Sequence, residues 1–503
     1  MTELELARLQ FGITTLFHFI FVPTSIGLTA WVAYCQTRWH RSGDETWLRM
    51  TRFWGKLMLI SLAIGVVTGI VQEFQFGMNW SQYSRYVGDV FGAPLAMEGL
   101  AAFFLESTFL GLWLFGWGRL KPRVHLATIW LLSIGTLLSA YFILAANSWM
   151  QHPVGYVINE ATGRAEMTSI WAVLTNSTLL WAFPHTILGA LTTGGALVLG
   201  VSAWKLLRAR RGDGPVDPVW SRSARNVLPI TLVAVLLTMV AGHFQGMLLE
   251  EQQPMKMAAA EAQFETEAPA AFSLFATGDL EHNPGHTNVN LRIPYALSLL
   301  ATGSFDGEVK GINEIQAEEE AKHGPGDYTP IIAVTYWTFR LMVGAGTLML
   351  LVAGLGLLLG RRGKLEHSRW FLRTAVGAIV LPHVANLTGW IFTEMGRQPW
   401  VVYGLLRTDD ANSPHVGAAS LWITLVGYTL IYGVLAAVGG WIALKEIRHG
   451  APPPSGGEGA GAGPGASGPG GAGAGGCGGP GEGAAGDGAP RPQTARPDLS
   501  LTY

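Results

Sequence analysis

The sequence predicts an all-α, polytopic membrane protein with nine transmembrane helices, an outside N-terminus and a cytoplasmic C-terminus. Three observations lead to this fold class. Hydrophobic residues make up 49% of the 503 residues and charged residues only 14%, a balance that suits helices surrounded by lipid better than a water-soluble core. Nine apolar runs are long enough to cross a hydrocarbon layer about 30 Å thick. Basic residues are concentrated in every second loop.

The apolar runs define the order of elements. They cover approximately residues 10–35, 53–76, 94–117, 124–147, 179–204, 226–249, 331–359, 371–393 and 420–444. The second run is the least regular, because Lys56 and Glu73 bracket it. We therefore divide the chain into helices 1–6 in residues 1–249, a long extracytoplasmic loop in residues 250–330, helices 7–9 in residues 331–448 and a terminal segment in residues 449–503.

The loops that follow the odd-numbered helices carry the orientation signal. Loops that stay in the cytoplasm are rich in Lys and Arg, whereas the alternate loops here are poor in both and the long loop is acidic. The N-terminus is therefore expected outside. The basic residues that carry this argument are Arg38, Arg41, Arg49, Arg52, Lys56, Arg119, Lys121, Arg123, Lys205, Arg208, Arg210, Arg211, Arg222, Arg225, Arg361, Arg362, Lys364, Arg369 and Arg373.

The two segments outside the helices differ in character. The loop of residues 250–330 is longer than a simple connection and is expected to be functional. We predict a short amphipathic helix at residues 255–264 and a mobile, solvated stretch at residues 306–327. Residues 449–503 are dominated by Gly, Ala, Pro and Ser and are expected to be disordered, with no chemistry of their own.

Four possible iron ligands fall on the same side of the predicted membrane: His18, His185, Met342 and Glu394. A His–Met pair is typical of a closed electron-transfer haem, and a lone His or carboxylate leaves a position open for oxygen. Taken singly, each His also fits a hydrogen bond to a neighbouring helix, and Met342 also fits simple packing. The sequence has only Cys35 and Cys477 and no C-x-x-C-H motif, so any haem must be held non-covalently.

Other charged residues lie within the predicted spans. Glu98 and Glu106 are eight residues apart, about 80° around a regular helix, and predict either a proton path or a pair of acids hydrogen-bonded between helices. Arg340 needs a negative partner, for which a haem propionate is one candidate. Arg397, directly after the end of helix 8, and Trp390 flank Glu394, and we assign both to cofactor binding.

Several longer motifs then resemble subunit I of cytochrome bd quinol oxidases, over the whole chain except the Gly-rich terminal segment. They occur in the same order as in that family. The matching runs are Arg8–Phe11 with His18 and Phe19, Glu73–Gly77, Glu98–Gly99 with Phe103–Ser107, His185, Lys256–Glu261, Tyr336–Met342 with Arg340, and Glu394 with Gly396–Trp400.

The resemblance implies a set of roles. His185 and Met342 would ligate the low-spin haem b558, and Arg340 would tune it; His18 and Glu394 would ligate haems b595 and d, with the assignment between them open. Lys256 and Glu261 would help to form the quinol site in a short Q-loop, and Glu98 and Glu106 would deliver protons.

The resemblance also implies a reaction and a setting. Quinol would be oxidised at the outer face of a bacterial cytoplasmic membrane and dioxygen reduced to water, with generation of a proton gradient. The implied partners are a homologous membrane subunit II and a small single-helix subunit. The sequence gives no sign of nucleic-acid binding.

Three other functions compete with this one. A haem–copper oxidase would require a copper site that normally includes adjacent histidines, and no His-His pair occurs. A secondary transporter without haem fits nine helices with buried Glu and Arg. A purely structural anchor for a catalytic partner predicts that Met342→Leu leaves every spectrum unchanged.

Overall fold

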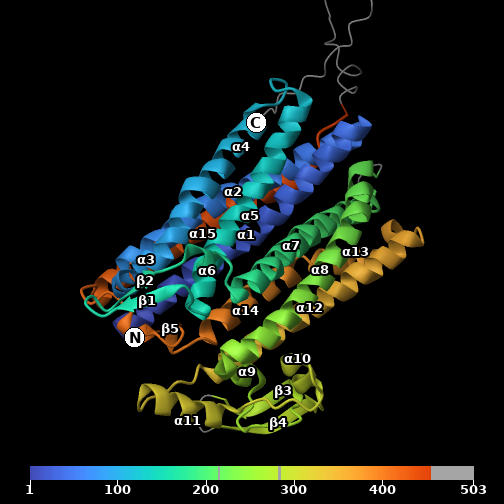
Figure 1. Ribbon diagram of the computed structural model, residues 1–503. Coiled ribbons are helices and arrows are strands. Elements are labelled where there is room, and N and C mark those ends of the chain that lie inside the picture. The colour runs from blue at the N-terminus through green and yellow to red at the C-terminus, as the bar shows by residue number, and fades with distance from the viewer. Residues whose placement is uncertain (213–215, 281–284, 455–503) are drawn as a thin grey trace, which may run out of the picture.

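The structure is a computed structural model that describes residues 1–212, 216–280 and 285–454. Within these residues, nine helical segments are long and apolar enough to cross a membrane, which confirms the predicted all-α fold. They lie side by side in one tilted bundle, with a smaller subdomain at one end (Figure 1). Of the predicted terminal segment, residues 455–503 lie outside the described residues.

The first half of the bundle contains four spans. They are α1 (Glu3–Ser42), α2 (Glu45–Met78), the interrupted helix α3–η1–α4 (Ser81–Met97, Glu98–Phe103 and Phe104–Phe115) and α5 (Pro122–Gln151). A capping box of Thr2 and Glu5 starts α1, and the Asp44 side chain accepts from the Thr46 N–H to start α2, so the orphan amides of each first turn are satisfied.

The second half contains five spans and their connections. They are α6–α7 (Ile170–Leu174 and Ser177–Ala209), α8 (Pro218–Gln252), α12 (Ile332–Arg361), α13–α14 (Arg369–Gly377 and Val380–Met395) and α15 (Ala418–His449). The short connecting elements are β1 (Tyr156–Asn159), β2 (Arg164–Met167), η2 (Leu365–His367), β5 (Trp400–Val402), β6 (Leu406–Arg407) and η3 (Thr408–Asp410).

Small residues allow helices of the bundle to pack closely where they cross. A Cβ added to Gly27 on α1 would lie 2.3 Å from the Ala190 carbonyl oxygen of α7, and one added to Gly194 would lie 2.7 Å from Gly27 Cα. Glycines at both positions let the two backbones touch, which is how helices commonly associate inside membranes. The crossing fixes α1 against α7 and thereby the relative placement of His18 and His185.

The third span departs from the prediction. It starts at Ser81 rather than near residue 94, and a π-helical turn at Glu98–Phe103 interrupts it. The spacing argument for Glu98 and Glu106 assumed a regular α-helix, and that assumption is wrong. A π-turn takes one more residue than an α-turn and often marks a functional site, so it changes the phase of every later residue in the span.

The segment between α8 and α12 folds into a loop subdomain. It contains α9 (Pro254–Glu261), the antiparallel hairpin β3–β4 (Phe272–Asp279 and His286–Ile293), α10 (Ala296–Thr302) and α11 (Ile312–His323). Two predictions for this segment are wrong. The predicted helix is present as α9, but residues Met255–Glu261 are buried on every side, so it is not amphipathic. Most of residues 306–327 forms α11 rather than a mobile loop.

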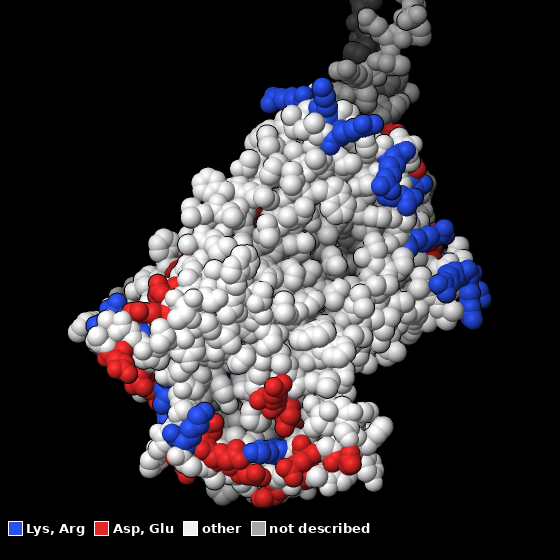
Figure 2. Space-filling model, in the orientation of Figure 1, with Lys and Arg blue, Asp and Glu red and all other residues white. Residues whose placement is uncertain are grey.

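The two ends of the bundle differ in charge. Lys and Arg side chains gather at the end away from the loop subdomain, and Asp and Glu side chains gather over the loop subdomain (Figure 2). We call these the basic end and the acidic end. The α1–α2, α4–α5, α7–α8 and α12–α13 connections share the basic end, so the alternation of basic loops in the sequence corresponds to one face of the molecule.

Candidate functional site

A cavity of about 1530 Å³ runs through the interior of the bundle. It is larger than the several hundred Å³ typical of a pocket for one small ligand. All four predicted iron ligands, His18, His185, Met342 and Glu394, line it. Glu98, Glu106, Lys256, Glu261, Trp390 and Arg397 also line it, whereas Arg340 does not. Residues from eight of the spans and the loop subdomain thus meet at one internal surface.

His18 is held by its neighbour on α2. Its Nδ1 lies 2.9 Å from the Thr68 hydroxyl, which lies 2.9 Å from the carbonyl oxygen of Ile64. Because the hydroxyl has one hydrogen and donates it within its own helix, the His18 Nδ1–H must be the donor to Thr68. The Nε2 of His18 therefore keeps a free lone pair, as a metal ligand requires. His18 lies further from the start of its helix than predicted, because α1 begins at Glu3 rather than near residue 10.

His185 is oriented in the same way by α8. Its Nδ1 lies 3.0 Å from the carbonyl oxygen of Thr238, which can only accept. The ring passes so close to Gly242 that an added Cβ there would lie 3.1 Å from the ring carbon Cε1. The Nε2 of His185 is again left as an acceptor. Both candidate histidines thus have the tautomer that suits iron.

Met342 occupies a notch in α14. A Cβ added to Gly389 would lie 2.8 Å from the Met342 sulfur, closer than atoms can approach without a shift. Glycine at position 389 therefore admits the thioether to the cavity wall. The thioether sulfur is a soft, weak acceptor that suits an electron-transfer haem better than a hydrogen-bonding role.

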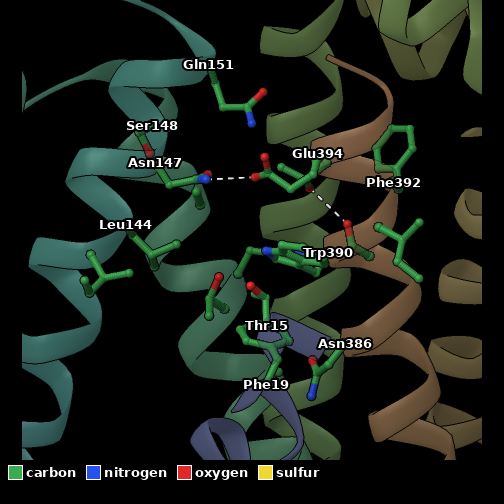
Figure 3. Close-up of a pocket in the computed structure, with 18 of the residues that line it drawn as sticks. Thr15, Phe19, Leu144, Asn147, Ser148, Gln151, Asn386, Trp390, Phe392 and Glu394 are labelled. Carbon is green, nitrogen blue, oxygen red and sulfur yellow. Dashed lines mark hydrogen bonds between the residues drawn. The ribbon is translucent and has the colours of Figure 1, made fainter. Parts of the chain in front are cut away.

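Glu394 lies at the acidic end of the cavity between two spans (Figure 3). One carboxylate oxygen accepts from Asn147 Nδ2 of α5 at 2.8 Å, and the other accepts from Arg397 Nη2 at 2.5 Å. Trp390 lies one helical turn before Glu394 on the same side of α14. A carboxylate offers about four acceptor positions, so these two hydrogen bonds orient Glu394 and leave it further lone pairs.

Three carboxylates line the part of the cavity formed by the third span. Glu98 accepts from the Ser139 hydroxyl of α5 at 2.7 Å, and Glu73 of α2 lies within hydrogen-bonding reach of Glu98. Glu106 lines the same cavity further along the span. The π-turn starts at Glu98, so the irregular backbone coincides with the first of these acids.

Lys256 reaches into the cavity from the loop subdomain. It is 3% exposed, and its Nζ donates to Gln151 Oε1 at 2.6 Å. Burial, and after it the positive Arg397, lowers the pKa of Lys256 to about 7, and the negative Glu394 opposes the shift. The side chain passes over Gly396, where an added Cβ would lie 2.6 Å from Lys256 Cγ. Lys256 is therefore a neighbour of the Glu394 site.

Glu261 belongs to a separate ion pair. It accepts from Arg340 Nη2 at 2.7 Å and from the Ser273 N–H at 2.8 Å. Burial raises the pKa of Glu261, and the Arg340 guanidinium opposes that shift. The Glu261 oxygen Oε1 is buried without a hydrogen-bond partner. Arg340 thus has a protein carboxylate as the negative partner that the sequence argument required.

Four polar residues that the sequence analysis did not select complete these contacts. Asn147 and Gln151 lie one turn apart on α5 and hold Glu394 and Lys256, respectively. Thr68 and Ser139 hold His18 and Glu98. A signal for the first pair was present, because two amides four residues apart share one face of a helix and seldom occur without partners in an apolar span.

The cavity suits a flat prosthetic group better than a bare metal ion. In the described part of the chain, no three His, Cys, Asp or Glu side chains form a group that could hold a metal ion. The candidate ligands come one at a time from different walls, and a haem brings its own ring nitrogens. Four lining glycines, Gly12, Gly99, Gly246 and Gly346, have open space where a Cβ would be, which leaves smooth wall for a macrocycle.

The bundle and its cavity define a multi-pass membrane protein with a large internal cavity lined by possible iron ligands. The chain belongs to the family of cytochrome bd terminal oxidase subunit I, whose model matches residues 6–451. It is 50% identical to cytochrome bd ubiquinol oxidase subunit 1 of Bacillus subtilis (strain 168), over 90% of this chain and 95% of that protein. It is 38% identical to cytochrome bd-II ubiquinol oxidase subunit 1 of Escherichia coli (strain K12), over 89% and 96%.

The fold agrees with a solved structure of the same family. The bd oxidase from Geobacillus thermodenitrificans superposes with a TM-score of 0.79 at 27% sequence identity, over 89% of this chain and 98% of that chain. The chain is therefore one subunit of a terminal quinol oxidase, an oxidoreductase of bacterial membranes with haem cofactors. The comparisons give no support to the transporter alternative.

Proposed function

We propose that this chain carries all three haems of its oxidase in the internal cavity. The observation that carries the proposal is that His18, His185, Met342 and Glu394 line one cavity, with both histidines fixed as Nδ1 donors. His185 and Met342 would hold the low-spin haem b558, and His18 and Glu394 would hold haems b595 and d. When bound, these haems supply electron transfer and oxygen reduction.

Lys256 and Arg397 would serve the haem held by Glu394. Both are buried at the acidic end of the cavity, and Glu394 is the carboxylate near both. Two cations facing one anion suit the negative propionates of a haem. Trp390 would pack against the same group from α14.

Glu261 and Arg340 would form the quinol side of the site. Quinol oxidation releases protons, and a general base must have a free acceptor within hydrogen-bond reach. The unpartnered Glu261 Oε1 meets this requirement, because it belongs to a residue that lines the cavity next to the loop subdomain. Arg340 would hold the carboxylate in place and keep a positive charge near the His185–Met342 site. Lys256 remains a proposed quinol-site residue, on the Glu394 side.

The charge distribution supports an orientation. The basic end would face the cytoplasm, following the general distribution of Lys and Arg, and the loop subdomain would lie outside the bacterial inner membrane. Protons from quinol would leave at the acidic end, and Glu98 and Glu106 would pass cytoplasmic protons toward the haem pair. This separation generates a proton gradient. A homologous subunit II and a small single-helix subunit would complete the complex.

The decisive test is Met342→Leu in the purified complex. Leucine keeps the volume but cannot ligate iron, so the reduced-minus-oxidised spectrum should lose the low-spin b558 band and keep the other bands. The control is Met58→Leu, a buried methionine of α2 that does not line the cavity. A Met342→Leu spectrum identical to that of the control would remove Met342 from the ligand set.

A further inference from the structure

The β3–β4 hairpin exposes an apolar face. Phe275, Val289, Leu291 and Ile293 are 44%, 56%, 60% and 44% exposed, respectively. Phe275 pairs with Leu291 across the two strands, and a register shift between Ser273 and Phe275 leaves Leu274 exposed as well. Such a bulge places neighbouring residues on the same side of a strand. No Lys, Arg, Asp or Glu is among the exposed residues in the described parts of these two strands.

The opposite face of the hairpin packs against the bundle. Ser273 and Ala276 are completely buried, and the Ser273 hydroxyl lies 2.8 Å from the Tyr336 hydroxyl of α12. The Ser273 backbone binds both Glu261 and Arg340. The hairpin therefore packs rigidly on the bundle by one face, and its apolar face is turned away from the core of the loop subdomain.

The apolar face is continuous with the lipid-facing side of α12. The Phe275 ring contacts the Trp337 ring edge-on, with 5.4 Å between the centroids. Trp337 lies in the second turn of α12 and is 36% exposed, and Leu341 one turn further is 51% exposed. In Figure 1 the hairpin and α10 extend sideways from the ends of α8 and α12 instead of continuing the helix axes.

The loop subdomain as a whole is amphipathic. Its exposed acids Glu314, Glu318 and Glu320 lie on α11, and Figure 2 shows acidic side chains gathered over this lobe. The exposed large apolar residues lie on the hairpin and in the adjacent α10 segment, at Tyr295, Leu299, Leu300 and Phe305. An apolar face with aromatic residues at its edge, opposite a charged face, is the pattern of elements that lie in the membrane interface.

We propose that the β3–β4 face rests in the interfacial layer of the lipid bilayer at the acidic end of the molecule. Lipid is favoured over a protein partner because the patch continues without a polar boundary into Trp337 and Leu341 of a membrane span. Burial of the patch in the interface would hold Ser273 and, through it, the Glu261–Arg340 pair in place. The loop subdomain is thus anchored to the membrane by its own hairpin as well as by the helices at its two ends.

Site-directed spin labelling of the complete oxidase tests this inference. Single cysteines at Leu291 and Val289 are labelled with a nitroxide in a Cys477→Ser background, since the other cysteine, Cys35, is buried. The complex is placed in nanodiscs of phosphatidylethanolamine and phosphatidylglycerol. Collision rates with oxygen, which partitions into lipid, are compared with those of a water-soluble nickel chelate. Leu341→Cys is the lipid-exposed control and Glu318→Cys the aqueous control.

Both hairpin positions should give an oxygen-to-nickel ratio close to that of Leu341→Cys and several-fold above that of Glu318→Cys. Two outcomes overturn the proposal. A ratio equal to that of Glu318→Cys would place the face in water. Low collision rates with both reagents would show that another subunit or a second copy of the chain covers it. Leu291 and Val289 are exposed, so either label can report if the other disturbs the fold.

Discussion

Individual side chains in this protein are positioned by hydrogen-bond partners, most of which lie on other spans. Thr68 and Thr238 set the tautomers of His18 and His185, and Asn147 and Arg397 orient Glu394. Ligands that are fixed by second contacts bind a metal more tightly than free ones. The candidate ligands could be predicted from the sequence because His and Glu are rare in apolar spans, but Thr68 and Asn147 could not, because their roles depend on which helices touch.

The Glu261–Arg340 pair leads to a prediction at the scale of single residues. Glu261→Gln keeps the shape of the side chain but removes the charge and the basic oxygen. We expect turnover with quinol to fall by about a hundredfold, the lower end of what a general base contributes. Oxidation of haems reduced directly by dithionite should continue at the normal rate. The measurements are oxygen uptake with quinol and stopped-flow absorbance.

Glu308→Gln, in the loop subdomain outside the cavity lining, is the matched control for that experiment. An equal loss in the quinol and direct-oxidation assays would place Glu261 in the oxygen-reducing part of the site instead of the quinol part.

Lys256 leads to a prediction about pH. Burial lowers its pKa from 10.5 to about 7, so between pH 7 and 10.5 the unfolded chain binds a proton that the folded chain does not. Stability should therefore rise with pH in this window. From pH 7 to pH 9 the gain is on the order of 2 kcal/mol, at 1.36 kcal/mol per pKa unit.

Lys256→Met should abolish this gain. The measurement is the apparent melting temperature of the detergent-solubilised complex at pH 7 and pH 9, for the native protein and for the variant. Exposed Lys445→Met on α15 is the control and should behave as the native protein does. If the native protein and Lys256→Met respond equally to pH, the Lys256 amine keeps the ordinary pKa of a solvated lysine in the folded protein, and the lowered pKa is wrong.

At the scale of elements, the length of each apolar run was sufficient to predict the spans, but it did not predict the breaks within them. All nine predicted runs are helical, because an apolar run of this length has no other stable backbone conformation in lipid. The π-turn at Glu98–Phe103 and the break between α13 and α14 leave no mark in composition. The β3–β4 hairpin was not predicted, although residues 288–293 alternate polar and apolar residues as a strand does. The bulge at Leu274 interrupts that alternation in β3 only.

The α1–α7 crossing gives a prediction for element packing. Gly27→Ala would place a methyl group 2.3 Å from the Ala190 carbonyl oxygen, so the two helices must separate. Overpacking of this kind costs about 1–3 kcal/mol. We expect a lower melting temperature and a weaker or broadened spectrum for both histidine-held haems. Gly427→Ala on α15, where an added Cβ meets nothing within 4 Å, should leave both measurements unchanged; a similar effect of the two substitutions would contradict the role of the crossing.

At the scale of the whole molecule, the charge distribution and the cavity together suggest a direction of proton movement. The cavity joins the carboxylates of the third span to the loop subdomain, and the basic end lies at the opposite end of the bundle. This arrangement could be anticipated from alternating loop charge, because each odd-numbered helix ends in a basic loop. The arrangement of the helices around the cavity could not be anticipated, because no local sequence pattern indicates which helices of a bundle are neighbours.

The side of the membrane on which protons are released can be measured in proteoliposomes that contain the complete oxidase. The enzyme is oriented with its loop subdomain outside, and quinol is added to the external solution. Oxygen consumption should then acidify the exterior. Glu106→Gln should slow both oxygen consumption and acidification, whereas the haem spectra should persist. Glu446→Gln, which replaces the surface partner of Lys56, should change neither. Unimpaired acidification in Glu106→Gln would exclude this carboxylate from the proton route.

The π-turn in the third span has a consequence for how the chain tolerates change. A helix advances by about 100° per residue, so the single additional residue of the wide turn determines which side chains after Phe103 point inward. Removing one residue there would let the span relax into an uninterrupted α-helix and rotate Glu106 and its successors toward lipid. A one-residue deletion at this site would therefore change which residues of the rest of the helix face the cavity, whereas a deletion in the connections at either end would only shorten a loop.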